Sequence, residues 1–315
     1  MSLPPLPPAA VAVLACPVCD RPVHADPAGL RCPAGHAFDR ARQGHVTLLP
    51  PGGTPHAGDS AAMVADRAEF LAAGHYAGVT AALADVALAG GPPETVLDVG
   101  GGTGAHLAGV LDRAPGAVGV VLDASRYAAR RAARVHPRAM AVVADSWARW
   151  PLLDGSVDRV LVVFAPRNGA ETARVLRPQG RLVVVTPAAD HLVELVGPLG
   201  LLSVDPAKAE RLTASLAPHL RWVASAAHRE ELLLDRAAVR TLVGMGPHAR
   251  HLAADELTAR IAALPEPVRV TVAVDVGTWV PAQRRGPSRD EGPAGRPGPR
   301  RAGVPAGSRG GRVSG

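Results

Sequence analysis

The residues best suited to chemistry lie in the stretch Val96–Gly104, which reads V-L-D-V-G-G-G-T-G. Its first four residues predict a short buried strand, and the glycines predict a tight turn into a helix that begins at 104 and reaches 113. Gly100 and Gly102 allow a ligand to approach the backbone closely, because a Cβ would hold it away. The free N–H groups at the start of the helix can then bind a polar group. The stretch therefore predicts a nucleotide-type binding turn.

Two kinds of ligand fit this turn. Gly100, Gly102 and Ala105 match the G-x-G-x-x-G/A pattern of dinucleotide sites. The alternative is the D-x-G-x-G-x-G turn of S-adenosylmethionine enzymes, which Asp98 and Gly104 complete. A carboxylate at this place suits an ammonium and a sulfonium and repels a pyrophosphate. We therefore expect S-adenosylmethionine, with a nicotinamide or flavin cofactor, or a turn without ligand, as the alternatives.

A second group of reactive residues lies near the start of the chain, spaced C-x2-C-x12-C-x3-H. The group consists of Cys16, Cys19, Cys32 and His36. These are four ligands for a tetrahedral Zn²⁺, which leaves no open position for water, so we expect a structural zinc. His24 and His45 lie nearby but lack this spacing to a cysteine, and unrelated cysteines are the alternative reading.

Alternating apolar runs and helical patterns must position the glycine turn. Strands are predicted over 117–122, 140–144, 157–164, 182–186 and 268–279. Helices are predicted over 60–74, 77–89, 126–135, 170–176, 205–217, 235–245 and 255–264. This order predicts an α/β fold with a parallel sheet, helices on both faces and ligands at the carboxyl ends of the strands.

Aspartates follow successive strands at that edge of the sheet. Asp98 would order the glycine loop or bind the methionine ammonium, Asp123 would accept from both ribose hydroxyls, and Asp145 from the adenine amine. A single aspartate at a strand end is as often a turn residue, but three after one glycine turn favour a cofactor site.

Composition divides the chain into regions. We predict a zinc-binding module over 1–50, a linker with helices over 51–92, a cofactor-binding domain over 93–282 and a disordered tail over 283–315. The tail is rich in Arg, Gly and Pro and carries the whole net charge of +6. We expect a solvated extension there, with an electrostatic contact to RNA as the alternative. No apolar run reaches the eighteen or so residues of a membrane span, so we expect a cytoplasmic protein without a membrane partner.

Several motifs occur together with the zinc pattern and the glycine turn. They are G-H-V-T-L-L from Gly44, G-D-S-A-A-M from Gly58, Arg67, F-L-A-A-G-H-Y from Phe70, F-A-P from Phe164, T-P from Thr186, and His191, Leu192 and Glu194. In this combination, Cys16 to about Pro281 resembles the 23S rRNA guanine-N1 methyltransferases, zinc-containing members of the class I S-adenosylmethionine-dependent methyltransferases. The resemblance implies a Rossmann-like domain that follows a small N-terminal zinc module. The family often has aromatic residues after the glycine turn, where this chain has Ala105 and His106, and we place His106 among the cofactor-binding residues.

The resemblance also implies a reaction, the transfer of a methyl group to N1 of a guanine in hairpin 35 of 23S rRNA. We expect guanine 748, with 745 as the alternative, and resistance to macrolides of the tylosin and mycinamicin type. Guanine N1 carries a proton, so a general base or donors to O6 are needed. From their places in the chain, the candidates are His191, Arg167, Glu194 and His75, with His191 preferred as the base. The arginines of the zinc module (Arg21, Arg31, Arg40 and Arg42) suit a grip on RNA.

Two other functions fit the same sequence. One is a small-molecule methyltransferase in which zinc only stabilises the fold, and the other is a non-catalytic RNA-binding protein of ribosome assembly. The intact Asp98, Asp123 and Asp145 argue against the second. The sequence leaves a homodimer open.

Overall fold

The computed structural model describes residues 4–53, 58–201, 205, 207–246 and 254–282. The chain divides into two compact units, Met1–Ala282 and Gln283–Gly315. The predicted tail over 283–315 lies outside the described residues.

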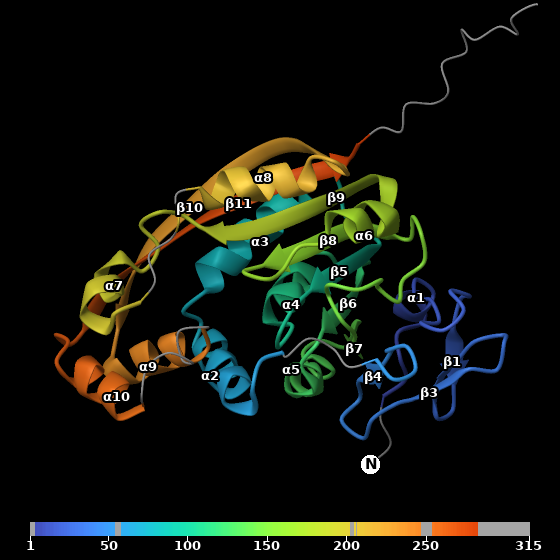
Figure 1. Cartoon of the computed structure of the whole chain (residues 1–315), viewed down its shortest axis with the longest axis horizontal. Helices are drawn as coiled ribbons and strands as arrows, with labels where there is room; N and C mark the ends of the chain where they lie inside the picture. Colours follow the sequence, from blue (N-terminus) through green and yellow to red (C-terminus); the bar gives the residue numbers. More distant parts are fainter. Residues whose placement is uncertain (1–3, 54–57, 202–204, 206, 247–253, 283–315) are drawn as a thin grey trace, which may run out of the picture. The chain divides into compact units, whose positions relative to one another are not determined.

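An eight-stranded sheet with the order β10-β11-β9-β8-β5-β6-β7-β4 forms the centre of the first unit (Figure 1). Five neighbouring strands are parallel: β5 (Thr95–Val99), β6 (Val118–Asp123), β7 (Ala139–Val143), β8 (Val157–Val163) and β9 (Leu176–Pro187). They read as continuous apolar runs because both faces of the sheet are covered. The predicted α/β architecture is confirmed in this part of the sheet.

One edge of the sheet differs from the parallel prediction. β11 (Val268–Pro281) pairs antiparallel with β9, and β10 (Leu220–Leu234) pairs antiparallel with β11. The sequence pattern did not predict β10, because most of its side chains are exposed and show little apolar alternation. β9 also begins at Leu176 and pairs with Val157, where a turn was expected over 177–180.

Helices cover both faces of the sheet, as predicted. One face packs against α2 (Ala61–Ala72), α3 (Ala77–Leu88), α4 (Ala105–Asp112), α5 (Arg126–Ala132), α7 (Val193–Leu199), α9 (Arg236–Gly244) and α10 (Ala254–Ala262). The other packs against α1 (Pro8–Val11), α6 (Gly169–Val175), α8 (Lys208–Leu216) and the zinc module. The helix α7 was not predicted from the sequence. Val96 faces the first core whereas Leu97 and Val99 face the second, so β5 is buried on both sides.

The N-terminal module is joined to the sheet through its backbone. It contains a small antiparallel sheet of β1 (His24–Asp26), β2 (Gly29–Arg31) and β3 (Ala37–Asp39). β4 (Val46–Thr47) then adds a short parallel strand beside β7. Near the start of the chain, the N–H of Ala15 donates to Pro151 O at 3.0 Å and the N–H of Leu153 donates to Val13 O at 2.9 Å. These bonds fix the module against the loop that follows β7.

In the described part of the chain, no single helix is long and apolar enough to cross a membrane. Among the described residues, α2 and α3 meet the length and composition of a span only when taken together, and the pair is bent by 83°.

Candidate active site and metal centre

The four predicted zinc ligands lie together in the structure. One ligand atom from each of Cys16, Cys19, Cys32 and His36 lies within 4.8 Å of the others. The Nδ1 of His36 is 3.4 Å from Cys16 Sγ and 3.3 Å from Cys32 Sγ, and the sulfurs of Cys19 and Cys32 are 3.7 Å apart. Bonds of about 2.0–2.3 Å to a tetrahedral zinc place ligand atoms roughly 3.3–3.8 Å apart. The donor set and its spacing therefore fit a structural zinc.

The electrostatic environment of Cys32 favours the ionised ligand. Burial works against ionisation, but N–H donation from His36 and Ala34 outweighs it and lowers the pKa of the Cys32 thiol to about 6. A thiolate is the form that binds a metal.

The glycine turn between β5 and α4 has the backbone that the sequence predicted. Gly100 and Gly102 have φ of +64° and +58°, in the left-handed region that favours glycine. The N–H of Gly100 donates to Leu122 O at 2.7 Å, which holds the turn against the end of β6. A Cβ on Gly101 would lie 2.5 Å from Asp98 Oδ2, so the turn lies directly over this carboxylate.

Asp98 is buried under the turn with no hydrogen-bond partner among the described residues for either carboxylate oxygen. Burial, and next the neighbouring Asp123, raise the pKa of Asp98 to about 7. A buried carboxylate without a partner is costly unless a cation accompanies it. The site is therefore suited to the ammonium group of a ligand such as S-adenosylmethionine.

Asp123 ends β6 and differs from Asp98 in its surroundings. Its Oδ2 accepts from the N–H of Gly102 at 2.9 Å, and its Oδ1 accepts from the N–H of Ser125 at 2.7 Å. Each carboxylate oxygen can accept a second hydrogen bond, so the pair of oxygens still suits two ribose hydroxyls. Burial raises the pKa of Asp123, although these two N–H donors oppose the shift.

Arg67 lies beside the turn and was not among the predicted site residues. Its Nη1 is 3.1 Å from the position of a Cβ on Gly102, its guanidinium forms an ion pair with Asp59, and its Nη2 donates to Met245 O at 2.8 Å. The sequence feature that could have pointed to Arg67 is its position shortly after the G-D-S motif. The predicted cofactor residue His106 is buried, with Nδ1 2.8 Å from Thr80 Oγ1 of α3. Burial, and next Arg67, lower the pKa of His106 to about 4, so the ring is neutral at pH 7.

Asp145 lies just beyond β7, as expected. Its Oδ1 accepts from the N–H of Trp147 at 2.8 Å, which closes a turn at the start of the following loop.

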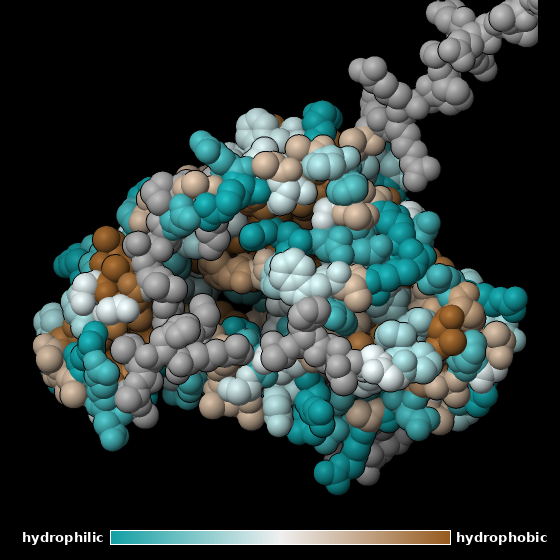
Figure 2. Space-filling view, in the orientation of Figure 1, coloured by the Kyte–Doolittle hydropathy of each residue, from teal (hydrophilic) through white to brown (hydrophobic). Residues whose placement is uncertain are grey.

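An aromatic group forms where β8 and β9 end. The rings of Phe164 and His191 have centroids 5.8 Å apart, and Tyr76 Oη is 3.5 Å from His191 Nε2. Phe164 is 42% exposed and has a φ of +53°, which is uncommon for a residue with a side chain. The group adjoins the glycine turn, because a Cβ on Gly100 would lie 2.7 Å from the Cβ of Ala165. Figure 2 shows a hollow close to this end of the sheet.

His191 is held in a defined orientation. Its Nδ1 accepts from the N–H of Ala273 at 3.2 Å. Since a backbone N–H can only donate, the proton of the neutral ring is on Nε2. This nitrogen faces Tyr76, a residue that sequence reasoning left out of the site.

The other three predicted catalytic residues have different surroundings. Arg167 follows β8 and has no hydrogen bond or ion pair within the described residues, and burial lowers its pKa. Glu194 is turned toward β11, where its oxygens accept from the N–H of Thr271 at 2.9 Å and from Thr271 Oγ1 at 2.5 Å. His75 packs on Phe70, with ring centroids 4.7 Å apart, whereas the next residue, Tyr76, reaches the site.

Glu194 is thereby better suited to holding β11 than to accepting a proton. Burial raises its pKa, but the two donors from Thr271 outweigh it and lower the pKa below the usual value.

The fold and these sites define an S-adenosylmethionine-dependent methyltransferase of the Rossmann-like class with an N-terminal zinc ribbon. Two family models agree: "RlmA, N-terminal", a zinc ribbon, matches residues 14–52, and "Methyltransferase domain" matches residues 96–180.

Three relatives extend over most of the chain. A protein of Micromonospora griseorubida assigned as a 23S rRNA (guanine-N(1)-)-methyltransferase is 54% identical, in an alignment that covers 85% of this chain and 97% of the relative. The 23S rRNA (guanine(748)-N(1))-methyltransferase of Streptomyces fradiae is 49% identical over 84% of this chain and 95% of its own length. YxjB of Bacillus subtilis, assigned to the same activity without a position, is 31% identical over 83% and 94%. The chain belongs to the 23S rRNA (guanine-N1)-methyltransferase family.

Proposed function

We propose that this enzyme methylates N1 of guanine 748 in hairpin 35 of 23S rRNA and thereby confers resistance to macrolides of the tylosin and mycinamicin type. The Streptomyces fradiae relative carries this position in its name. The observation that carries the proposal is that a carboxylate buried without a partner among the described residues, Asp98, and an exposed aromatic side chain, Phe164, lie at the carboxyl ends of the paired strands β5 and β8. A cationic methyl donor and a nucleobase fit these two places.

The cofactor would lie along the ends of β5, β6 and β7. Asp98 would bind the methionine ammonium, Asp123 the ribose hydroxyls and Asp145 the adenine amine. When it is bound, S-adenosylmethionine supplies a methyl group already activated on a sulfonium. The chain's part is then to align the guanine with that methyl group.

Phe164 would stack on the target guanine. Its ring is exposed at the end of β8, and its strained backbone is consistent with a functional constraint. An enzyme that acts on a base must present that base outside the helix, and an aromatic face stabilises it there.

Two donors would stabilise the guanine as N1 loses its proton. As the proton leaves for solvent, negative charge builds on O6. Arg167 is a cation without a partner in the described part of the chain, and His191 carries its N–H on Nε2, beside the hydroxyl of Tyr76. We therefore assign His191 as a donor to O6, in place of the general base that the sequence suggested, because its Nδ1 is already engaged by Ala273.

The zinc module would hold the RNA hairpin. Arg21 is exposed on it, and Arg31 is 46% exposed although it pairs with Asp26. Contacts to phosphates from such residues position the RNA without reading its sequence.

Primer extension on 23S rRNA from cells with and without the enzyme tests the proposal. N1 methylation blocks Watson–Crick pairing, so we expect a stop one nucleotide before guanine 748 only when the enzyme is present. A stop at 745 would change the position, and no stop would overturn the rRNA substrate. Transfer of labelled methyl to a metabolite would favour a small-molecule methyltransferase, and failure to bind S-adenosylmethionine would favour a non-catalytic RNA-binding protein.

A further inference from the structure

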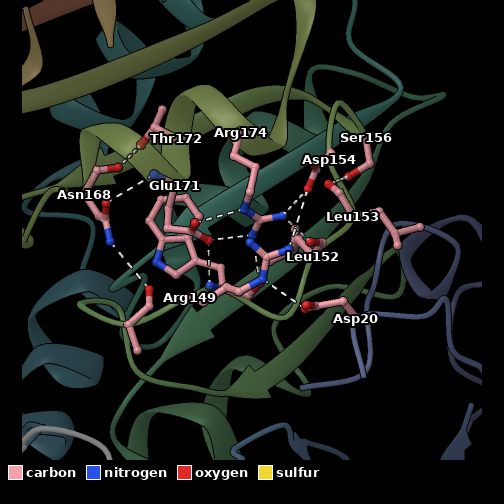
Figure 3. A network of polar contacts seen from close by, with 12 residues as sticks. Asp20, Arg149, Leu152, Leu153, Asp154, Ser156, Asn168, Glu171, Thr172 and Arg174 are labelled. Carbon is pink, nitrogen blue, oxygen red and sulfur yellow. Dashed lines mark hydrogen bonds and ion pairs between the residues drawn. The ribbon is translucent and has the colours of Figure 1, made fainter. Parts of the chain in front are cut away.

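The loop between β7 and β8 is fixed in place by a polar network that Figure 3 shows. Arg174 of α6 donates to Trp150 O at 2.9 Å and to Leu152 O at 2.7 Å, and it pairs with both Glu171 and Asp154. Glu171 in turn accepts from the N–H of Trp150 at 2.8 Å. The middle of this loop is therefore held to α6.

The zinc module holds the same loop from the other side. Asp20 follows the ligand Cys19 directly, and its Oδ1 accepts from Arg149 Nε at 2.9 Å. Backbone bonds from 13–15 to 151–153 lie beside this pair. The loop is thus fixed between the zinc module and α6.

This fixed loop presents one large aromatic ring to solvent. Trp147 is 54% exposed, whereas Trp150, three residues later, is 1% exposed and donates from Nε1 to Ser146 O at 3.0 Å. An exposed tryptophan on an ordered loop loses little conformational freedom when it stacks on a planar partner. Its placement suits binding better than packing, since its ring is outside the core.

The backbone of Trp147 joins the end of β7 to the turn that follows β8. Its N–H is bonded to Asp145, and its carbonyl oxygen accepts from Asn168 Nδ2 at 3.3 Å. Asn168 follows Arg167 and caps α6, just after β8. The cofactor's ribose and adenine are instead assigned to Asp123 and Asp145, at the ends of β6 and β7. Trp147 therefore lies between the place assigned to adenine and the strand whose end would receive the guanine.

We propose that Trp147 is a stacking platform for an unpaired base of the RNA hairpin that neighbours the target guanine. The inference rests on the proposed function, because it takes an RNA hairpin as the substrate. Single-stranded bases are commonly bound by stacking on aromatic side chains. The platform lies between the module that would hold the hairpin and the site of methyl transfer, so it would fix the register of the RNA.

The test compares Trp147→Ala with Trp147→Phe, and uses Trp222→Ala as the matched control. Trp222 is 52% exposed, close to the exposure of Trp147, but it belongs to β10 at the opposite edge of the sheet from β4. For each full-length protein, three quantities are measured: the Kd for a hairpin 35 transcript, the Kd for S-adenosylmethionine and the rate of methyl transfer to the transcript.

We expect Trp147→Ala to weaken RNA binding about 10-fold or more, in the range of one stacked base. The Kd for S-adenosylmethionine should change less than about twofold, and Trp147→Phe should restore most of the RNA affinity because the ring is kept. Equal RNA affinity in Trp147→Ala and Trp222→Ala would overturn the inference. A weaker Kd for S-adenosylmethionine with unchanged RNA binding would overturn it too, by showing that the ring covers the cofactor.

The two proposals fail in different ways. If the wild-type enzyme binds the transcript but transfers no methyl to it, the proposed reaction is wrong, and the binding measurements still decide the role of Trp147. If transfer occurs and Trp147→Ala binds RNA normally, only the platform is wrong.

Discussion

Asp98 and Asp123 lie at the carboxyl ends of neighbouring strands of one sheet, but their carboxylates differ in their hydrogen bonds. Asp123 accepts from the backbone at both oxygens, whereas Asp98 has no partner among the described residues at either one. Their mutual repulsion contributes to raising the pKa of Asp98, after burial. The two carboxylates therefore repel each other, and a bound cation would relieve this repulsion. The cofactor-free protein is destabilised by it.

The substitution Asp98→Asn should stabilise the cofactor-free enzyme and weaken its binding of S-adenosylmethionine. A folded pKa near 7, against an ordinary value of 3.8, means that the folded state binds more protons between these values, so stability falls as pH rises through this range. At pH about 8, Asp98→Asn should raise the free energy of unfolding of the cofactor-free enzyme by a few kcal/mol, since one pKa unit corresponds to about 1.4 kcal/mol. The gain should vanish near pH 4, below which both states are protonated.

Urea unfolding at several pH values and calorimetry with S-adenosylmethionine measure the two effects. The cofactor affinity of Asp98→Asn should fall by about 100-fold, as expected for a lost buried ion pair. Asp85→Asn is the control, because Asp85 is 67% exposed in its side chain and pairs with Arg113 at the surface. A variant that is less stable than wild type at pH 8 would contradict the assignment of Asp98 as an unpartnered carboxylate.

Cofactor binding should depend on pH in a direction set by the same group. The raised pKa of Asp98 means that binding an ammonium requires loss of a proton below pH about 7. The affinity for S-adenosylmethionine should fall by up to about tenfold per pH unit below that value. Titration calorimetry in two buffers of different ionisation enthalpy should show proton release at pH about 6 and little at pH about 8. An affinity that is constant over this range would rule out the role of Asp98.

Features fixed by local spacing could be predicted from the sequence, and features fixed by distant contacts could not. The zinc ligands and the glycine turn are local patterns, and both appear in the structure. The strand β10 escaped prediction because its exposed residues acquire their conformation from pairing with β11, which is later in the chain. No local signal marks such a strand.

The same distinction explains the catalytic candidates. Glu194 looked available as a base, but Thr271, 77 residues away, occupies its oxygens. His75 and Tyr76 are adjacent in one motif, and only the packing at the start of α3 decides that Tyr76 faces His191. The sequence therefore predicted which segments of the chain form the site. Which side chains of these segments face the site depends on tertiary contacts.

His191 provides a test of the catalytic assignment. If it donates to O6, His191→Ala should lower kcat by roughly 10- to 100-fold, the scale of a lost donor to developing charge. The rise of kcat with pH should remain, because the proton lost is that of guanine N1. His136→Ala is the control. His136 precedes β7 and so lies at the amino end of that strand, whereas the proposed site lies at the carboxyl ends of the strands. Loss of the pH-dependent rise in His191→Ala would show instead that His191 is the general base.

Zinc binding should depend on His36 and not on His24. His36→Ala removes one of four ligands, so metal analysis should find much less than one zinc per chain and the thermal midpoint should fall by several degrees. His24→Ala should keep one zinc and a midpoint near that of wild type, because His24 lies outside the ligand group. Equal zinc content in the two variants would contradict the assigned ligand set.

Arg174 should be far more important for stability than its surface counterpart Arg113. The side chain of Arg174 is 13% exposed, as is that of its partner Glu171, and it also donates to two backbone carbonyls. Arg174→Met leaves the buried carboxylate of Glu171 without its cation and removes the donor to these carbonyls, so the free energy of unfolding should fall by about 3 kcal/mol. Arg113→Met breaks an ion pair whose side chains are 47% and 67% exposed, and should cost less than about 1 kcal/mol. Urea unfolding of both variants at pH about 7 measures the contrast. Similar losses would mean that the network in Figure 3 does not fix the loop that carries Trp147.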